Sequence, residues 1–167
     1  MTLLGINGHR HGVTPVTDDQ TVVAVDRLIA DTLGRLRADW AALSAAVVPR
    51  PDVLHTDSVL ELLSGLLATG GKRFRPRMVH WGWLAATGGD DPAGYHHVVR
   101  IGAALELLHA FALIHDDVMD ASETRRGYPA VHVQARQQHV RWGSFGDPQR
   151  YGENIAILAG DLAHSEA

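Results

Sequence analysis

The sequence predicts an all-α domain, and three observations support this class. Apolar residues recur in most segments at the three- and four-residue spacing that places them on one face of a helix. Alternating apolar and polar residues, which are typical of strands, are nearly absent. Gly and Pro stand at the ends of the apolar segments, where they stop or start helices.

The first predicted helix begins at residues 17–19 and continues to the prolines at 49 and 51. Thr17, Asp18 and Asp19 supply an N-cap and acidic first-turn residues, which suit the positive end of a helix dipole. The apolar face of this helix comprises Val22, Val25, Leu28, Ile29, Leu33, Leu36, Trp40 and Leu43.

The second predicted helix begins near Thr56 or Asp57 and ends at the glycine pair 70–71, a favoured C-terminal signal. Its apolar side comprises Val59, Leu62, Leu63, Leu66 and Leu67. The third begins near Pro76, because proline suits the first turn of a helix, and ends at the glycine pair 88–89.

The fourth and longest predicted helix starts at 91–92 and continues to about Asp120. Residues 121–130 are expected to form a loop, and a short helix is expected over 130–141. Pro148 starts the last helix after a turn, with Ile155, Leu158 and Leu162 among its apolar residues. This pattern continues to the final residue without a capping Gly or Pro, as in a helix cut in its middle.

Length and composition favour a single globular domain over residues 17–167, preceded by a mobile lead-in over 1–16. The formal net charge of −4 argues against a nucleic-acid partner. The chain has no cysteine, which excludes disulfides and thiolate chemistry, and its eleven histidines show no zinc spacing. No apolar run is expected to reach the roughly 20 residues of a stable membrane span, and we expect a cytoplasmic protein.

Three carboxylates gather at the end of the fourth predicted helix. Asp116 and Asp120 share a helical face about 40° apart, with His109 on the same face, while Asp117 lies about 100° around the helix. Like charges at this spacing repel, and the negative end of the helix dipole disfavours them further. Mg²⁺ would compensate them, since it bridges carboxylates to phosphates. The alternative is a solvated acidic helix end.

Two clusters of cations lie upstream and downstream of these acids. The stretch "GGKRFRPR" places four of them between a glycine pair and a helix start, namely Lys72, Arg73, Arg75 and Arg77. Amides at a helix N-terminus and arginine side chains both suit phosphate groups. Arg125 and Arg126 form a second cationic turn beside the acids. The first cluster alone is also explained as a solvated basic loop, and Arg125 alone as a surface ion-pair partner of the acids. The combination of both clusters with the acids predicts a diphosphate site.

The sequence resembles the trans-isoprenyl diphosphate synthases of the polyprenyl synthetase family. The resemblance is carried by "GGKRFRP" (70–76), "ELLHAFALIHDDVMD" (106–120), "RRG" (125–127) and "NIAILAGDLAHSEA" (154–167), and it covers most of residues 20–167. It implies an all-α, isoprenoid synthase-type helical bundle around a central cavity, truncated to about its N-terminal half. It also implies that an allylic diphosphate is joined to isopentenyl diphosphate by a prenyltransferase.

The resemblance also implies roles for individual residues. Asp116 and Asp120 would bind Mg²⁺, with Mn²⁺ as an alternative, and Asp117 would support them. Arg125 would hold the allylic diphosphate, and these four residues form the catalytic group. The remaining substrate-binding residues, which would hold isopentenyl diphosphate, are Lys72, Arg75, His109 and Arg126.

Phe111 and Ala112 are the residues expected to set product length. In the family, a bulky residue shortly before the first aspartate closes the floor of the cavity. Phe111 five positions before Asp116, together with a small Ala112, resembles the geranylgeranyl diphosphate synthases, with farnesyl diphosphate synthases next. A helical wheel places Phe111 about 140° from Asp116, so an ordinary core phenylalanine is the alternative.

The family's second aspartate-rich motif has no counterpart in these 167 residues. We therefore expect this chain alone to have little or no synthase activity. Its uncovered apolar faces should promote a homodimer or a higher oligomer, or pairing with a complementary chain. A terpene cyclase and a non-catalytic interaction subunit are the alternative functions, and the "GGKRFRP" turn argues against a cyclase because a cyclase holds no isopentenyl diphosphate.

Overall fold

A computed structural model describes residues 16–46, 57–89 and 91–167 of the chain. These residues form six helices and one two-stranded hairpin, which confirms the predicted all-α class. The elements are α1 (Asp18–Ala46), α2 (Asp57–Ala68), α3 (Phe74–Thr87), α4 (Pro92–Met119), β1 (Thr124–Arg125), β2 (Tyr128–Pro129), α5 (Val131–Arg141) and α6 (Pro148–Ser165). The predicted lead-in over 1–16 lies outside the described residues, except for its last residue.

The helix starts follow the predicted capping chemistry. The Thr17 hydroxyl accepts from the Gln20 amide at 3.2 Å, and the Gln20 side chain accepts from the Thr17 amide at 2.9 Å. This reciprocal pair is a capping box, which satisfies two amides that have no partner inside α1. Asp91 and Asp147 cap α4 and α6 by accepting from backbone amides within the first turn.

Two predictions need correction. Helix α3 begins at Phe74, two residues before Pro76. Proline is tolerated anywhere in the first turn, since the amide that it lacks would have no helical partner there, so its position does not fix the first helical residue. Residues 121–130 are not only a loop, since β1 pairs antiparallel with β2. Arg126 and Gly127 form its turn with φ of 55° and 84°, the left-handed conformation that tight hairpins require. Strands of two residues are too short to carry an alternating pattern, so no local signal marks them.

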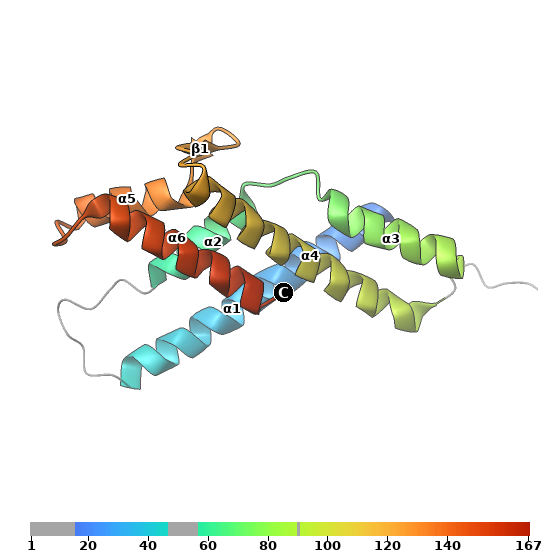
Figure 1. The fold of residues 1–167 in the computed structure, drawn as a ribbon. Coiled ribbons are helices and arrows are strands. Elements are labelled where there is room, and N and C mark those ends of the chain that lie inside the picture. The colour runs from blue at the N-terminus through green and yellow to red at the C-terminus, as the bar shows by residue number, and fades with distance from the viewer. Residues whose placement is uncertain (1–15, 47–56, 90) are drawn as a thin grey trace, which may run out of the picture.

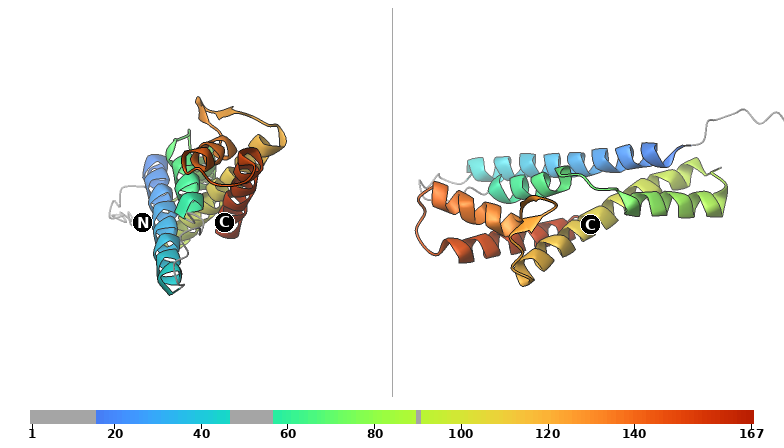
Figure 2. Two further views of the ribbon diagram at one scale, coloured as in Figure 1. Left: turned by 90° about the vertical axis from the view of Figure 1, so that its left-hand side faces the viewer. Right: turned by 90° about the horizontal axis from the view of Figure 1, so that it is seen from above.

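Helix α4 runs obliquely through the structure and organises the other elements (Figure 1). Helix α3 packs beside its N-terminal half, and α6 packs on it with α5 toward the other end. Helix α1 lies along the long axis of the molecule with α2 beside its C-terminal half (Figure 2). The core lies between these helices and includes Val25, Leu63, Leu107, Ile114, Ala156 and Ala159.

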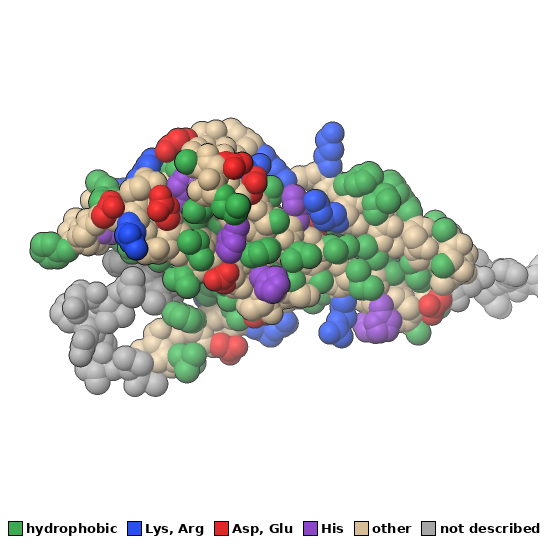
Figure 3. Space-filling model, in the orientation of Figure 1, with side chains coloured by type: hydrophobic (Ala, Val, Ile, Leu, Met, Phe, Trp, Pro, Cys, Tyr) green, Lys and Arg blue, Asp and Glu red, His purple; other side chains and the backbone are tan. Residues whose placement is uncertain are grey.

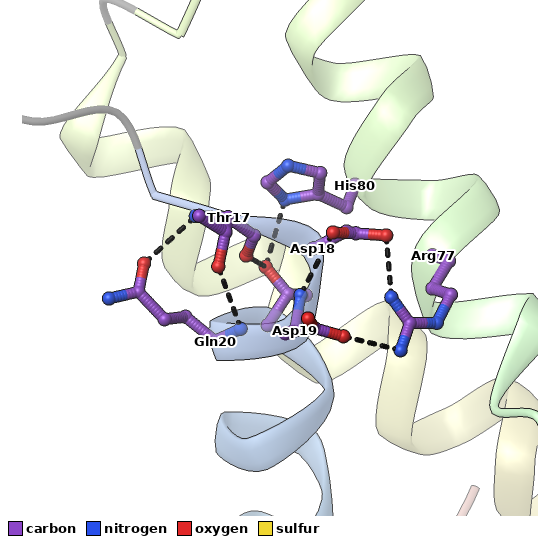
Figure 4. A network of polar contacts seen from close by, with 7 residues as sticks. Thr17, Asp18, Asp19, Gln20, Arg77 and His80 are labelled. Carbon is purple, nitrogen blue, oxygen red and sulfur yellow. Dashed lines mark hydrogen bonds and ion pairs between the residues drawn. The ribbon is translucent and has the colours of Figure 1, made fainter.

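Polar groups connect the N-terminal ends of α1 and α4 to α3. The buried Thr21 hydroxyl lies 2.8 Å from Nδ1 of His80 and 3.1 Å from the Tyr95 hydroxyl. Nearby, Arg77 of α3 forms ion pairs with the two acids that open α1, at 2.6 Å to Asp19 (Figure 4). This end of the bundle is therefore fixed by hydrogen bonds and ion pairs as well as by apolar packing.

Apolar side chains remain uncovered on α3, α4 and α6, and Figure 3 shows hydrophobic atoms gathered over these helices. On α4 a stripe at helical spacing leads to Asp116, made of the exposed Ile101, Leu108 and Ala112 and the half-buried Leu105. Ile101 is 50% exposed and Leu108 is 43% exposed. The surface therefore agrees with the expectation that the chain presents uncovered apolar faces.

Helix α4 is also long and apolar enough, by length and composition alone, to cross a membrane. An 18-residue window within it has a mean hydropathy of 1.5, and 39% of that window is buried. The expectation that no stretch reaches such a length was therefore wrong on this criterion. One such helix is weak evidence for a membrane span, because the core helix of a globular domain passes the same test.

Candidate functional site

The C-terminal end of α4 separates the three predicted carboxylates into two kinds. Asp117 is buried, with its side chain 3% exposed, whereas the side chain of Asp116 is 57% exposed. Asp120 is the C-cap residue and is also exposed. The helix therefore presents Asp116 and Asp120 outward, on one face, and turns Asp117 into the protein.

Arg125, in strand β1, reaches back to this helix end. Its Nε donates to Asp117 at 2.9 Å, and its Nη2 lies 3.1 Å from Asp116. Hydrogen bonds to Asp117 raise the pKa of the Arg125 guanidinium above its ordinary value, so the group stays cationic. Arg125 thus offsets part of the charge that makes the acidic cluster unfavourable, and it leaves Asp116 and Asp120 open to solvent.

A cavity of about 340 Å³ lies between the start of α3 and the middle of α4. All four residues predicted to hold isopentenyl diphosphate line it, as part of the set Gly71, Lys72, Arg73, Phe74, Arg75, Glu106, His109 and Arg126. Among the described residues, no side chain caps the N-terminus of α3, where Arg73 is the N-cap residue. The cavity therefore combines cationic side chains with uncapped helix amides, as an anion site requires.

The four cations of "GGKRFRPR" divide into two pairs with different partners. Lys72 and Arg75 are exposed, and neither forms an ion pair within the described part of the chain. Arg73 is turned inward to Asp26 and Glu106, at 2.9 Å from each. Arg77 is paired with Asp18 and Asp19 of α1. Of these four cations, Lys72 and Arg75 are therefore the ones available to a ligand.

Arg126 approaches this cavity from the hairpin. Its guanidinium donates to the carbonyl oxygen of Gly70, and a Cβ at Gly71 would lie 3.0 Å from the same nitrogen. Glycine at position 71 thus permits the close approach of the arginine to the loop. Arg126 follows Arg125 directly in the sequence, yet Arg125 pairs with the acids of α4 while Arg126 contacts the loop at Gly70.

The electrostatic environment of His109 reflects the cations that converge on the cavity. Burial lowers the pKa of this histidine, and the charges of Arg75, Arg126 and Arg125 lower it further, while Glu106 opposes them. The imidazole is therefore neutral at pH 7. It can donate or accept one hydrogen bond without adding to the charge of the pocket.

The residues expected to set product length face different ways. The Phe111 ring packs against His115 and against His164 of α6, with ring centroids 4.5 Å and 5.0 Å apart. Ala112 is exposed and shares the face of Asp116, four residues further along α4. The role of both residues in product length stays a prediction.

Glu106 is a buried acid in the wall of the cavity that sequence reasoning missed. It is 5% exposed and lines the cavity beside His109. Arg73 was likewise not distinguished from the neighbouring cations. One signal was present, because Glu106 and His109 are three residues apart and must share a helical face.

The outward carboxylates fit a magnesium ion by their chemistry. Mg²⁺ in proteins is usually held by one or two carboxylates together with phosphate oxygens and water. Asp116 and Asp120 provide two such carboxylates. Over residues 16–46, 57–89 and 91–167, no three acidic or histidine side chains converge to hold a metal. A magnesium ion at this end of α4 would take its remaining ligands from phosphate oxygens and water.

Known proteins resemble this chain in sequence and in fold. A short chain isoprenyl diphosphate synthase of Methanothermobacter thermautotrophicus is 41% identical over 113 residues, which are 66% of this chain and 28% of that protein. A geranylgeranyl diphosphate synthase of Sulfolobus acidocaldarius is 40% identical over 102 residues, 61% of this chain and 24% of that protein. Among solved structures, geranylgeranyl pyrophosphate synthase from Corynebacterium glutamicum, complexed with isoprenyl diphosphate and magnesium, matches with a TM-score of 0.72 and 34% identity.

The matched region is only part of each relative. The chain spans about a quarter of the length of these curated relatives, and its match covers 89% of this chain and 39% of the solved synthase. The model of the polyprenyl synthetase family matches residues 56–167, which include the cavity, the acidic helix end and the hairpin. With that match and the shared helical fold, the chain belongs to the polyprenyl synthetase family.

Proposed function

We propose that this chain supplies the diphosphate-binding part of a prenyltransferase that joins an allylic diphosphate to isopentenyl diphosphate. The observation that carries the proposal is the division of two consecutive arginines between two sites. Arg125 pairs with the acidic end of α4, and Arg126 reaches the cavity loop at Gly70. A hairpin of this kind would hold two diphosphates side by side, as a reaction between two diphosphate substrates requires.

The acidic end is the proposed allylic site. Asp116 and Asp120 would hold Mg²⁺, which supplies Lewis-acid stabilisation of the negative charge on the leaving diphosphate. Asp117 is buried and oriented by Arg125, so it fixes the arginine rather than binding a ligand. Arg125 presents a preorganised cation to the leaving group, whose charge develops as the allylic carbon–oxygen bond breaks.

The cavity at the start of α3 is the proposed isopentenyl diphosphate site. Lys72, Arg75 and Arg126 hold the diphosphate, and neutral His109 adds a hydrogen bond. The double bond of isopentenyl diphosphate then attacks the allylic carbon, a carbon–carbon bond forms, and a proton is lost. Neither substrate forms a covalent bond to the protein.

The exposed apolar stripe of α4 is the proposed wall for the growing prenyl chain. It leads away from Asp116 through Ala112 and Leu108, and a dry apolar wall protects a cation from water. Geranylgeranyl diphosphate is the favoured product and farnesyl diphosphate the next. In an active preparation that contains this chain, Ala112→Phe should shorten the product, whereas unchanged product length would remove Ala112 from this role.

Binding calorimetry with isopentenyl diphosphate tests the cavity on this chain itself. We expect Lys72→Met and Arg75→Met to weaken binding at least about tenfold each, since each removes a charge-assisted contact. Arg27→Met, an exposed cation of α1 away from the cavity, serves as the matched control and should leave affinity unchanged. Equal affinity of the unaltered chain and all three variants would contradict the assignment of this cavity to isopentenyl diphosphate.

Turnover tests the reaction and its partners. The chain matches only 39% of the solved synthase, so we expect the 167-residue chain to bind diphosphate but to turn over little or none. We also expect it to self-associate through its uncovered apolar faces, which light scattering after size exclusion would measure. Ordinary turnover of isopentenyl diphosphate with an allylic diphosphate and Mg²⁺ would contradict the first expectation, and a strict monomer would contradict the second.

A further inference from the structure

Arg73, a cation of the cavity loop, forms a hydrogen bond inside the protein through each nitrogen of its guanidinium group. Its side chain is 14% exposed, and its three nitrogens contact three different elements. Nε donates to Asp26 of α1 at 2.9 Å, Nη1 to Glu106 of α4 at 2.9 Å, and Nη2 to the carbonyl of Leu67 in α2 at 2.8 Å. Its φ of 44° is in the left-handed region, which non-glycine residues seldom adopt.

Glu106 is an anion in the wall of a cavity that is otherwise suited to anions. Its side chain is 6% exposed, and it lines the same cavity as Lys72, Arg75 and His109. A buried carboxylate with no partner would repel a diphosphate at short range, because the low dielectric of the interior strengthens the repulsion. Among the described residues, Arg73 is the cation that forms an ion pair with Glu106.

We propose that Arg73 is a positioning residue that neutralises Glu106 and so keeps the cavity cationic for a diphosphate. The pair also fixes residue 73 between Lys72 and Arg75, which leaves those two side chains on the cavity side of the loop. This inference rests on the proposed function, since it names the group that makes the same diphosphate site work. Arg73 lines the cavity, but each of its three guanidinium nitrogens already donates to an acceptor within the protein.

Three variants separate this role from a purely structural one. Arg73→Met leaves Glu106 as an unpaired anion, and it should weaken binding of isopentenyl diphosphate and of inorganic pyrophosphate alike by at least about tenfold. Glu106→Gln keeps an oxygen that can accept from Arg73, so its affinity should stay within about threefold of the unaltered chain. The double variant Arg73→Met/Glu106→Gln removes the repelling charge and should bind at least about fivefold more tightly than Arg73→Met.

Arg77→Met is the matched control. Like Arg73, Arg77 forms an ion pair with an acid of α1. Unlike Arg73, it does not line the cavity. Both single arginine variants should lower the melting temperature, whereas only Arg73→Met should change affinity. Calorimetry is performed well below the melting temperature of every variant, with the folded state verified by circular dichroism. If Arg73→Met does not fold, Glu106→Gln and Glu106→Ala give the test, since both should retain binding.

The outcomes distinguish this inference from the proposed function. If the unaltered chain binds neither isopentenyl diphosphate nor pyrophosphate, the proposed function fails and this inference fails with it. If the unaltered chain binds but Arg73→Met binds within twofold of it, or the double variant binds no better than Arg73→Met, this inference alone is overturned. A tenfold loss of affinity for isopentenyl diphosphate in Glu106→Gln or Glu106→Ala would also overturn this inference.

Discussion

Glycine at position 152 allows α5 and α6 to approach each other closely, and this contact gives a sharp prediction of stability. A Cβ on Gly152 would lie 2.3 Å from the carbonyl oxygen of His132 and 3.1 Å from the amide nitrogen of Arg136. A carbon–oxygen contact needs about 3.3 Å, so the two helices would have to separate by about 1 Å. Because the opposing atoms are backbone, no side-chain rotation can relieve the clash.

The expected size of the effect follows from two opposing terms. Overpacking a close contact costs about 3 kcal/mol at the upper end of its usual range. Replacing glycine by alanine within a helix gains about 1 kcal/mol. Gly152→Ala should therefore lower the free energy of unfolding by about 2 kcal/mol.

Two other glycines give matched controls for this substitution. A Cβ on Gly34 in α1 would meet no atom within 4 Å, so Gly34→Ala should raise the free energy of unfolding by about 1 kcal/mol. At Gly160 the clash is with the ring of His115, 2.4 Å away. That ring can rotate at the expense of its 3.2 Å hydrogen bond to the Ile157 carbonyl, so Gly160→Ala should be close to neutral.

Urea unfolding followed by circular dichroism at 222 nm would measure all three variants. With a slope of about 2 kcal/mol per molar urea, the midpoint should fall by about 1 M for Gly152→Ala and rise by about 0.5 M for Gly34→Ala. A Gly152→Ala midpoint equal to or above that of the unaltered chain would refute the inferred close packing of α5 on α6.

Three further predictions concern the polar groups of the fold and the site. Arg125→Met should lower the free energy of unfolding by about 2 kcal/mol because it leaves Asp117 buried and unpaired, and Asp117→Asn added to it should recover part of the loss in the same urea assay. Thr21→Val should cost about 1–2 kcal/mol because it removes the partner of His80, whereas Thr21→Ser should stay near the unaltered stability. Burial and nearby guanidinium groups depress the pKa of His109, so the unfolded chain binds the proton more tightly than the folded one. The stability that this histidine contributes is present above pH 6.5 and is lost as the pH falls through the lower folded pKa. The free energy of unfolding of His109→Gln should therefore depend less on pH over that range. A pH profile equal to that of the unaltered chain would contradict the lowered pKa of His109.

The helices could be predicted because each of their signals is local. The Thr17 cap, the glycine at position 88 and the prolines at 92 and 148 act within one turn of the residue concerned, and each marks an observed helix end. The hairpin could not be predicted in the same way, because its strands are two residues long and its turn depends on left-handed φ values at Arg126 and Gly127. Nothing in such a short stretch distinguishes a paired strand from an open loop.

The sequence indicates which of the candidate residues lie near one another, but not which way each side chain points or which partner it binds. Spacing on α4 places Asp116 and Asp120 together, and the structure presents both outward. For Asp117 the sequence predicted only that it lies about 100° around the helix from Asp116, not that it points into the protein. Its pairing with Arg125 depends on the turn of the chain after the end of α4. Likewise, four cations within six residues look alike in sequence, while the structure commits Arg73 and Arg77 to acids that lie 33 to 59 residues away.

The separation of the two proposed diphosphate sites follows from α4 itself. His109 lines the cavity and Asp116 begins the acidic end, and seven residues of one straight helix hold them about 10 Å apart along its axis. Apart from Arg75, which lies in the first turn of α3, the cations of both sites come from less regular segments, the loop at 70–73 and the hairpin at 124–129. Each of these segments is anchored to groups on the bundle. Arg125 is tied to Asp117, and Arg73 to Glu106, both of which are buried residues of α4. The same helix therefore sets the spacing of the two proposed sites, and through these two acids it anchors both the loop and the hairpin.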